Sequence, residues 1–75
     1  MNPDATQPTD DQLKEIYQQQ HQHTIWMIEH RRANGMEDKI PAIERGQIDL
    51  EQKMRSIDPK LANELEKKAG RNARA

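Results

Sequence analysis

Cysteine is absent from the 75-residue sequence, and so is phenylalanine. Without cysteine the chain has no disulfide, no thiolate nucleophile and no cysteine-bound zinc site, and disulfides and zinc are common aids to the stability of very small proteins. Trp26 and Tyr17 are the only aromatic residues, and 32% of the chain is hydrophobic against 33% charged. Because a chain of this size buries only ~60% of the surface it exposes when unfolded, we expect a thin core that self-association completes.

Long hydrophobic runs are also missing. A membrane-spanning helix needs ~20 predominantly apolar residues, and no stretch of this sequence approaches that length. Residues 1–11 are acidic and polar, whereas a secretory signal has a basic start followed by an apolar segment. The sequence therefore predicts neither membrane insertion nor a secretion signal, and the cytoplasm is the default location.

The first helix is predicted over residues 10–34. Thr9 is a good N-cap, and Gln12 stands three residues later, where it completes a capping box. At the other end, Asn34-Gly35 follows a run of basic residues, and both features are typical of a helix C-terminus. A helix of this length would extend for about 37 Å.

Two shorter helices are predicted further along the chain. Residues 41–57 begin with Pro41, which is tolerated only in the first turn of a helix. Residues 59–69 follow Asp58, a good N-cap, and precede Gly70. Pairs such as Asp49 with Lys53 and Glu51 with Arg55 have the spacing of exposed ion pairs on the second helix.

These signals predict an all-α fold, in which two antiparallel helices form a helical hairpin and a short third helix follows at the C-terminus. We expect a single helical domain over residues 9–69, a disordered arm at 1–8 and a basic tail at 70–75.

The apolar residues of each helix indicate which face meets its neighbours. On a helical wheel, seven residues of the first helix lie within about 60° of one line and predict the face toward the hairpin partner: Leu13, Ile16, Tyr17, Gln20, Thr24, Met27 and Ile28. The second helix offers a coiled-coil-like stripe of Ile43, Gln47, Leu50, Met54 and Ile57. Three polar members, Gln20, Thr24 and Gln47, could set the register or the oligomeric state, or could simply be polar helix positions.

Catalytic and metal-binding chemistry has little support in the sequence. His21 and His23 lie about 200° apart on a helix, while His23 and His30 are about 10 Å apart, so neither pair chelates a metal well. We interpret these histidines as solvated. The glycines are scattered and no serine stands beside a base, so we expect no catalytic residue, no metal and no cofactor, and a protein that is not an enzyme.

Trp26 lies nearly opposite the predicted hairpin face. With it on the wheel are Gln19, His23, His30 and Ala33, and a tryptophan with polar neighbours is typical of interface hot spots. The first interpretation is a protein-binding surface made of these five residues. The alternative is that the third helix folds back and covers Trp26 as ordinary core.

Basic residues gather near two helix ends. They are candidate contacts for an anion or a nucleic acid: Arg31, Arg32, Lys67, Lys68, Arg71 and Arg74. Against this, the formal net charge is −1 and no aromatic residue interleaves the basic tail. These cations could equally well complement a helix dipole or solvate the tail.

The function predicted is therefore a small protein–protein interaction module. It would act as an adaptor, an assembly factor or a stoichiometric inhibitor, of the type found in phages and mobile elements, and would pair with itself as a dimer or dock on a larger protein. The alternative is a nucleic-acid-associated regulator that acts as a dimer through its basic patches.

Overall fold

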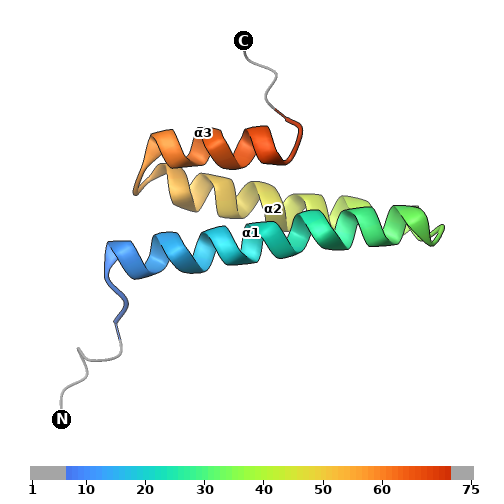
Figure 1. Cartoon of the computed structure of the whole chain (residues 1–75), viewed down its shortest axis with the longest axis horizontal. Helices are drawn as coiled ribbons and strands as arrows, with labels where there is room; N and C mark the ends of the chain where they lie inside the picture. Colours follow the sequence, from blue (N-terminus) through green and yellow to red (C-terminus); the bar gives the residue numbers. More distant parts are fainter. Residues whose placement is uncertain (1–6, 72–75) are drawn as a thin grey trace.

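The computed structural model describes residues 7–71, and within them every regular element is helical (Figure 1). The elements are α1 (Asp10–Ala33), a short 3₁₀ helix η2 (Glu37–Lys39), α2 (Ile40–Arg55) and α3 (Pro59–Lys68). The all-helical fold with three α-helices is confirmed, and each helix begins and ends within two residues of its predicted limit. Of the arm expected at residues 1–8, the first six residues lie outside the described part of the chain.

Side-chain caps explain why α1 and α3 begin where they do. The Thr9 hydroxyl accepts a hydrogen bond from the Gln12 amide at 3.2 Å, and the Thr9 amide donates to Gln12 Oε1 at 2.9 Å, so the predicted capping box is present. At α3, the Asp58 carboxylate accepts from the Leu61 amide at 3.3 Å. After α1, Gly35 adopts a φ of +72°, which other residues reach only with strain.

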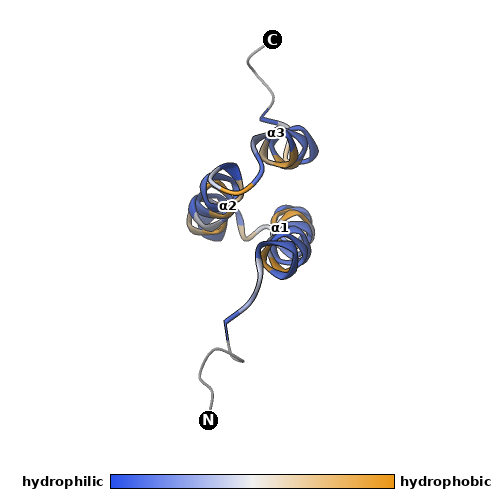
Figure 2. Ribbon diagram, turned by 90° about the vertical axis from the view of Figure 1, so that its left-hand side faces the viewer, coloured by the Kyte–Doolittle hydropathy of each residue, from blue (hydrophilic) through white to orange (hydrophobic). Residues whose placement is uncertain are grey.

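The three helices lie at the corners of a triangle when they are viewed end-on (Figure 2). Figure 1 shows α1 and α2 side by side, with the chain running toward the turn at Gly35 and returning along α2. α3 is much shorter and packs mainly on α2, over the half of the α1–α2 pair that holds the start of α1. Among residues 7–71, no third helix lies beside the other half of the pair.

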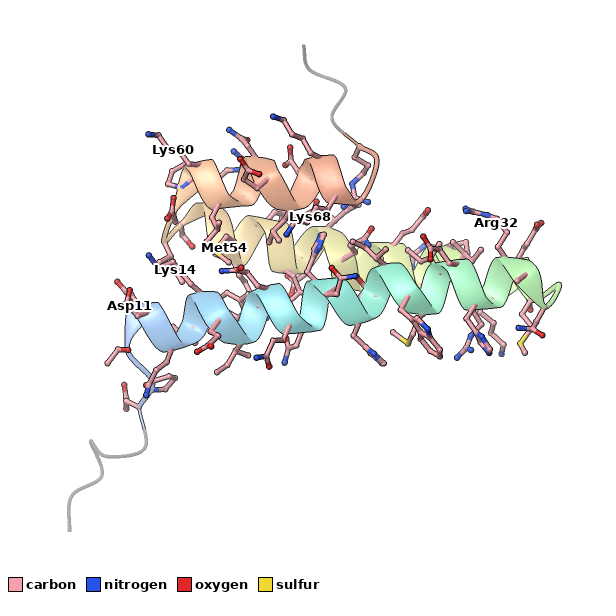
Figure 3. The ribbon with its side chains drawn as sticks, viewed as in Figure 1. Asp11, Lys14, Arg32, Met54, Lys60 and Lys68 are labelled. Atoms are coloured by element: carbon pink, nitrogen blue, oxygen red, sulfur yellow. The ribbon has the colours of Figure 1, made fainter. Side chains whose placement is uncertain are left out.

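The apolar core sits where all three helices meet. It is a cluster of Met54, Ala62 and Leu65, with Tyr17 and Leu61 packed against it. Met54 is fully buried, and Figure 3 shows it between the helices at the end covered by α3. A core of this size agrees with the thin core that the composition predicts.

The face that α1 turns inward overlaps the predicted one but is rotated from it. Five of the seven predicted residues are buried or half-buried: Leu13, Tyr17, Thr24, Met27 and Ile28. Ile16 is 40% exposed and Gln20 is exposed, although both were expected on the hairpin side. His21, which lies outside the predicted face, is buried. The inward face is rotated by about 60° from the line of highest hydropathy, because His21 finds a polar partner inside the molecule.

On the surface, the expected ion pair between Asp49 and Lys53 is present, with 3.0 Å between Oδ2 and Nζ. The hydrogen bond to the Asp49 carboxylate, together with its Coulomb attraction, raises the pKa of Lys53 above its ordinary value of 10.5. Across residues 7–71, no helix has both the length and the hydropathy needed to cross a membrane.

Replacing Met54 with alanine should lower the free energy of unfolding by about 2–5 kcal/mol, because it opens a cavity in the small core that the helices share. The measurement is urea denaturation followed by circular dichroism. Ile48→Ala removes an apolar side chain from a position that is 39% exposed, and should cost less than about 1 kcal/mol. An equal decrease in the free energy of unfolding in the two variants would contradict a core centred on Met54.

Candidate functional site

The outer face of α1, opposite its buried face, carries a line of exposed and uncharged side chains. This outer stripe consists of Ile16, Gln19, His23, Trp26, His30 and Ala33. Trp26 is 54% exposed, which makes it the most exposed large hydrophobic residue in the described chain. The stripe contains all five residues that the sequence predicts as a protein-binding surface, together with Ile16.

Two histidines hold the indole of Trp26 between them. The His30 ring stacks on it with 4.8 Å between ring centroids and 10° between planes, and the His23 ring stacks at 5.9 Å and 14°. The Asn34 side-chain amide, through Nδ2, donates a hydrogen bond to the His30 carbonyl at 2.7 Å. The same nitrogen lies 3.4 Å from His30 Nε2. Flanking rings restrict the rotamers of Trp26, so less conformational entropy is lost when the indole is buried by a partner.

The alternative interpretation of Trp26, as core covered by the third helix, is wrong for the described chain. α3 lies against α2 on the other side of α1, and its apolar residues contact Met54 rather than Trp26. Gln19 and Ala33 are exposed as well. The structure thus places all five predicted residues on one accessible face.

A buried polar network occupies the space between the helices. Glu51 is only 3% exposed, and its Oε2 lies 2.7 Å from His21 Nε2. The Arg71 guanidinium donates to the same carboxylate oxygen. Because an ionised carboxylate only accepts hydrogen bonds, Nε2 is the ring nitrogen that donates. His21 Nδ1 is buried with no hydrogen-bond partner among residues 7–71.

The same network continues through amide and hydroxyl groups. Arg71 donates to Gln47 Oε1 at 2.7 Å, and Gln47 Nε2 donates to Thr24 Oγ1 at 3.0 Å. The Thr24 hydroxyl in turn donates to the His21 carbonyl at 2.6 Å. Two of the three residues expected in a polar seam, Thr24 and Gln47, are therefore buried and paired, whereas Gln20 is exposed.

The sequence did not predict the contact between the two titratable residues of this network, His21 and Glu51. His21 was interpreted as solvated and is buried, and Glu51 was expected to pair with Arg55 on the surface. Arg55 instead bonds Glu66 and Asn63 of α3. No local signal could have revealed the pairing of His21 with Glu51, because the two residues are thirty positions apart and both also occur commonly at exposed positions.

The predicted basic clusters are brought partly together. Arg32 from α1 and Lys68 from α3 line one cleft of about 180 Å³. Glu29 and Glu44 line the same cleft, so its formal charges balance. Its volume lies below the ~300 Å³ at which typical small-molecule pockets begin.

The remaining basic residues have different surroundings. Arg31 is half-buried near the end of α1, and Lys67 is exposed in the last turn of α3. Arg71 belongs to the predicted basic tail, but its guanidinium donates hydrogen bonds to Gln47 and Glu51. Arg74 lies outside the described residues.

Within residues 7–71, no three histidine, aspartate or glutamate side chains gather closely enough to hold a metal ion together. A scan against protein-family models found no match, and searches of curated proteins and of solved structures found none either.

Arg71→Gln should lower the free energy of unfolding by about 1–3 kcal/mol, because it removes the cation bound to the buried Glu51 carboxylate. Lys67→Gln is the matched control: it removes one positive charge from an exposed position nearby and should change stability by less than about 0.5 kcal/mol. Urea denaturation of the two variants checks this. If Arg71→Gln lowers the free energy of unfolding by no more than Lys67→Gln does, the buried Glu51 carboxylate is not stabilised by Arg71.

Proposed function

We propose that this chain is a small protein-binding module and that the outer stripe of α1 is its binding surface. The observation that carries the proposal is Trp26, which is 54% exposed and stacked between two histidines on a face that no other described helix covers. Tryptophan is among the residues most enriched at binding hot spots, since its large ring offers apolar area together with one hydrogen-bond donor.

The chemistry of the stripe favours a protein as the partner. None of its six residues carries a formal charge when histidine is neutral, so its burial against another protein incurs no ion desolvation cost. The glutamine and histidine side chains can form hydrogen bonds around the indole, as polar residues do at the rim of an interface. An adaptor, an assembly factor or a stoichiometric inhibitor, of the type found in phages and mobile elements, would need such a surface and no catalytic group.

In this proposal α1 and α2 form a helical hairpin that supports the binding surface. α2 and α3 pack on the inward face of α1, and the Glu51 network fixes which residues of α1 point outward. The module would pair with itself or dock on a larger protein in a coiled-coil-like manner, and would act in the cytoplasm.

A nucleic-acid-associated regulator that acts as a dimer is the second candidate function. Arg32 and Lys68 in one cleft are the observation in its favour. It has weaker support, because Glu29 and Glu44 line the same cleft and Arg71 is engaged by Glu51. A contact with several phosphates would weaken steeply as salt is raised, whereas a contact anchored by Trp26 would depend far less on salt.

Trp26→Ala should weaken binding about tenfold or more, whether the partner is the chain itself or another protein, and should leave the helical content unchanged, since the indole is not part of the core. Self-association is measured by sedimentation equilibrium over a range of concentrations. Binding of another protein is measured by its retention on the immobilised chain from an extract of the source cells. Circular dichroism reports the helical content.

Ile48→Ala is the control for this prediction, because Ile48 is also an exposed large hydrophobic residue but belongs to α2. It should bind as the unmodified chain does. If Trp26→Ala also binds as the unmodified chain does, the outer stripe is not the binding surface. If Trp26→Ala loses its helical content, the indole is part of the fold and the proposal is wrong.

A further inference from the structure

The residues of the outer stripe follow the spacing of a coiled-coil seam. From Ile16 to Ala33 the steps between successive members alternate between three and four positions, which is the 3.5-residue period of such a seam. In this frame His21 takes the position opposite the seam, where its burial against Glu51 fits a helix that has one face inward and one free. The stripe is about 26 Å long, enough for six layers of contact.

The order of residues along the stripe is complementary to itself when two copies run antiparallel. Placing Ile16 of one copy opposite Ala33 of the other sets a large apolar side chain against a small one. The same register sets Gln19 opposite His30, an amide opposite an imidazole that can share a hydrogen bond with it. It also sets His23 opposite Trp26, which extends the ring stacking already present within α1.

Charges beside the stripe are compatible with this register. Glu29 is placed near Gln22 of the second copy, so no like charges face one another at that point. The chain as a whole has a formal net charge of −1, so two copies repel one another only weakly.

We propose that the partner of the outer stripe is a second copy of this chain, and that the two α1 helices pair antiparallel with Ile16 of each opposite Ala33 of the other. The pairing is two-fold symmetric, so each layer occurs twice and the association closes at a dimer. This inference rests on the proposed function, because it names the occupant of the same surface.

The test uses engineered cysteines, which is direct because the natural chain has none. Ile16→Cys and Ala33→Cys are made as separate variants, and both leave the rings around Trp26 in place. Each variant alone, and an equimolar mixture of the two, is treated with a mild oxidant that converts two thiols to a disulfide. Covalent dimers are then measured on a non-reducing gel.

The antiparallel register predicts that the mixture forms covalent dimers and that each variant alone forms few, since two identical cysteines would lie at opposite ends of the stripe. If Ile16→Cys and Ala33→Cys each cross-link alone, the helices pair in parallel and the register is wrong. Gln52→Cys, at an exposed position of α2, replaces Ile16→Cys in a control mixture for chance collisions. An equally strong band from that control mixture would also overturn the register.

Failure of the self-pairing is distinguishable from failure of the proposed function. A wild-type chain that sediments as a monomer at every concentration, yet retains another protein in a Trp26-dependent manner, would overturn the self-pairing alone. If circular dichroism shows that either variant has lost its helices, Gln19→Cys and His30→Cys replace the pair. They occupy another predicted layer, and their mixture must cross-link for the register to stand.

Discussion

Glu51 is the residue on which the arrangement of the helices depends. An ionised carboxylate removed from water is strongly destabilising unless cations and hydrogen-bond donors surround it. Here both kinds of partner come from elsewhere in the chain: His21 from α1, and Arg71 from beyond the end of α3. One carboxylate on α2 thereby connects the first helix to the end of the described chain, and the interaction is possible only when all three helices are in place.

This polar centre takes up space that apolar residues occupy in a typical helical bundle. The apolar cluster around Met54 lies at the end covered by α3, and Gln47 with Thr24 continues the contact between α1 and α2 by hydrogen bonds. Such a network adds less stability than a well-packed apolar layer, but it penalises a shifted register, because a slip of one residue would leave a buried charge unpaired. The polar network therefore specifies the register of the helices, at the expense of a larger apolar core.

Helix limits were predictable from the sequence, whereas the rotation of α1 about its axis was predictable only in part. The capping box at Thr9, the Asp58 cap and the turn at Gly35 depend on neighbouring residues, so local chemistry determines them. Which face of α1 turns inward depends on Glu51, thirty residues after His21, and hydropathy alone counts both as surface residues. The candidate binding residues were found because Trp26 is far from either choice of inward face.

The interaction that buries His21 also determines what the outer stripe displays. His21 and Trp26 lie about 140° apart on the same helix, so turning the imidazole inward toward Glu51 turns the indole outward. Had α1 been oriented by hydropathy, Ile16 would be buried between the helices and one end of the stripe would be lost. The polar network thus couples the fold to the proposed binding surface: the residues that specify how the helices pack within one chain also determine which face of α1 is exposed.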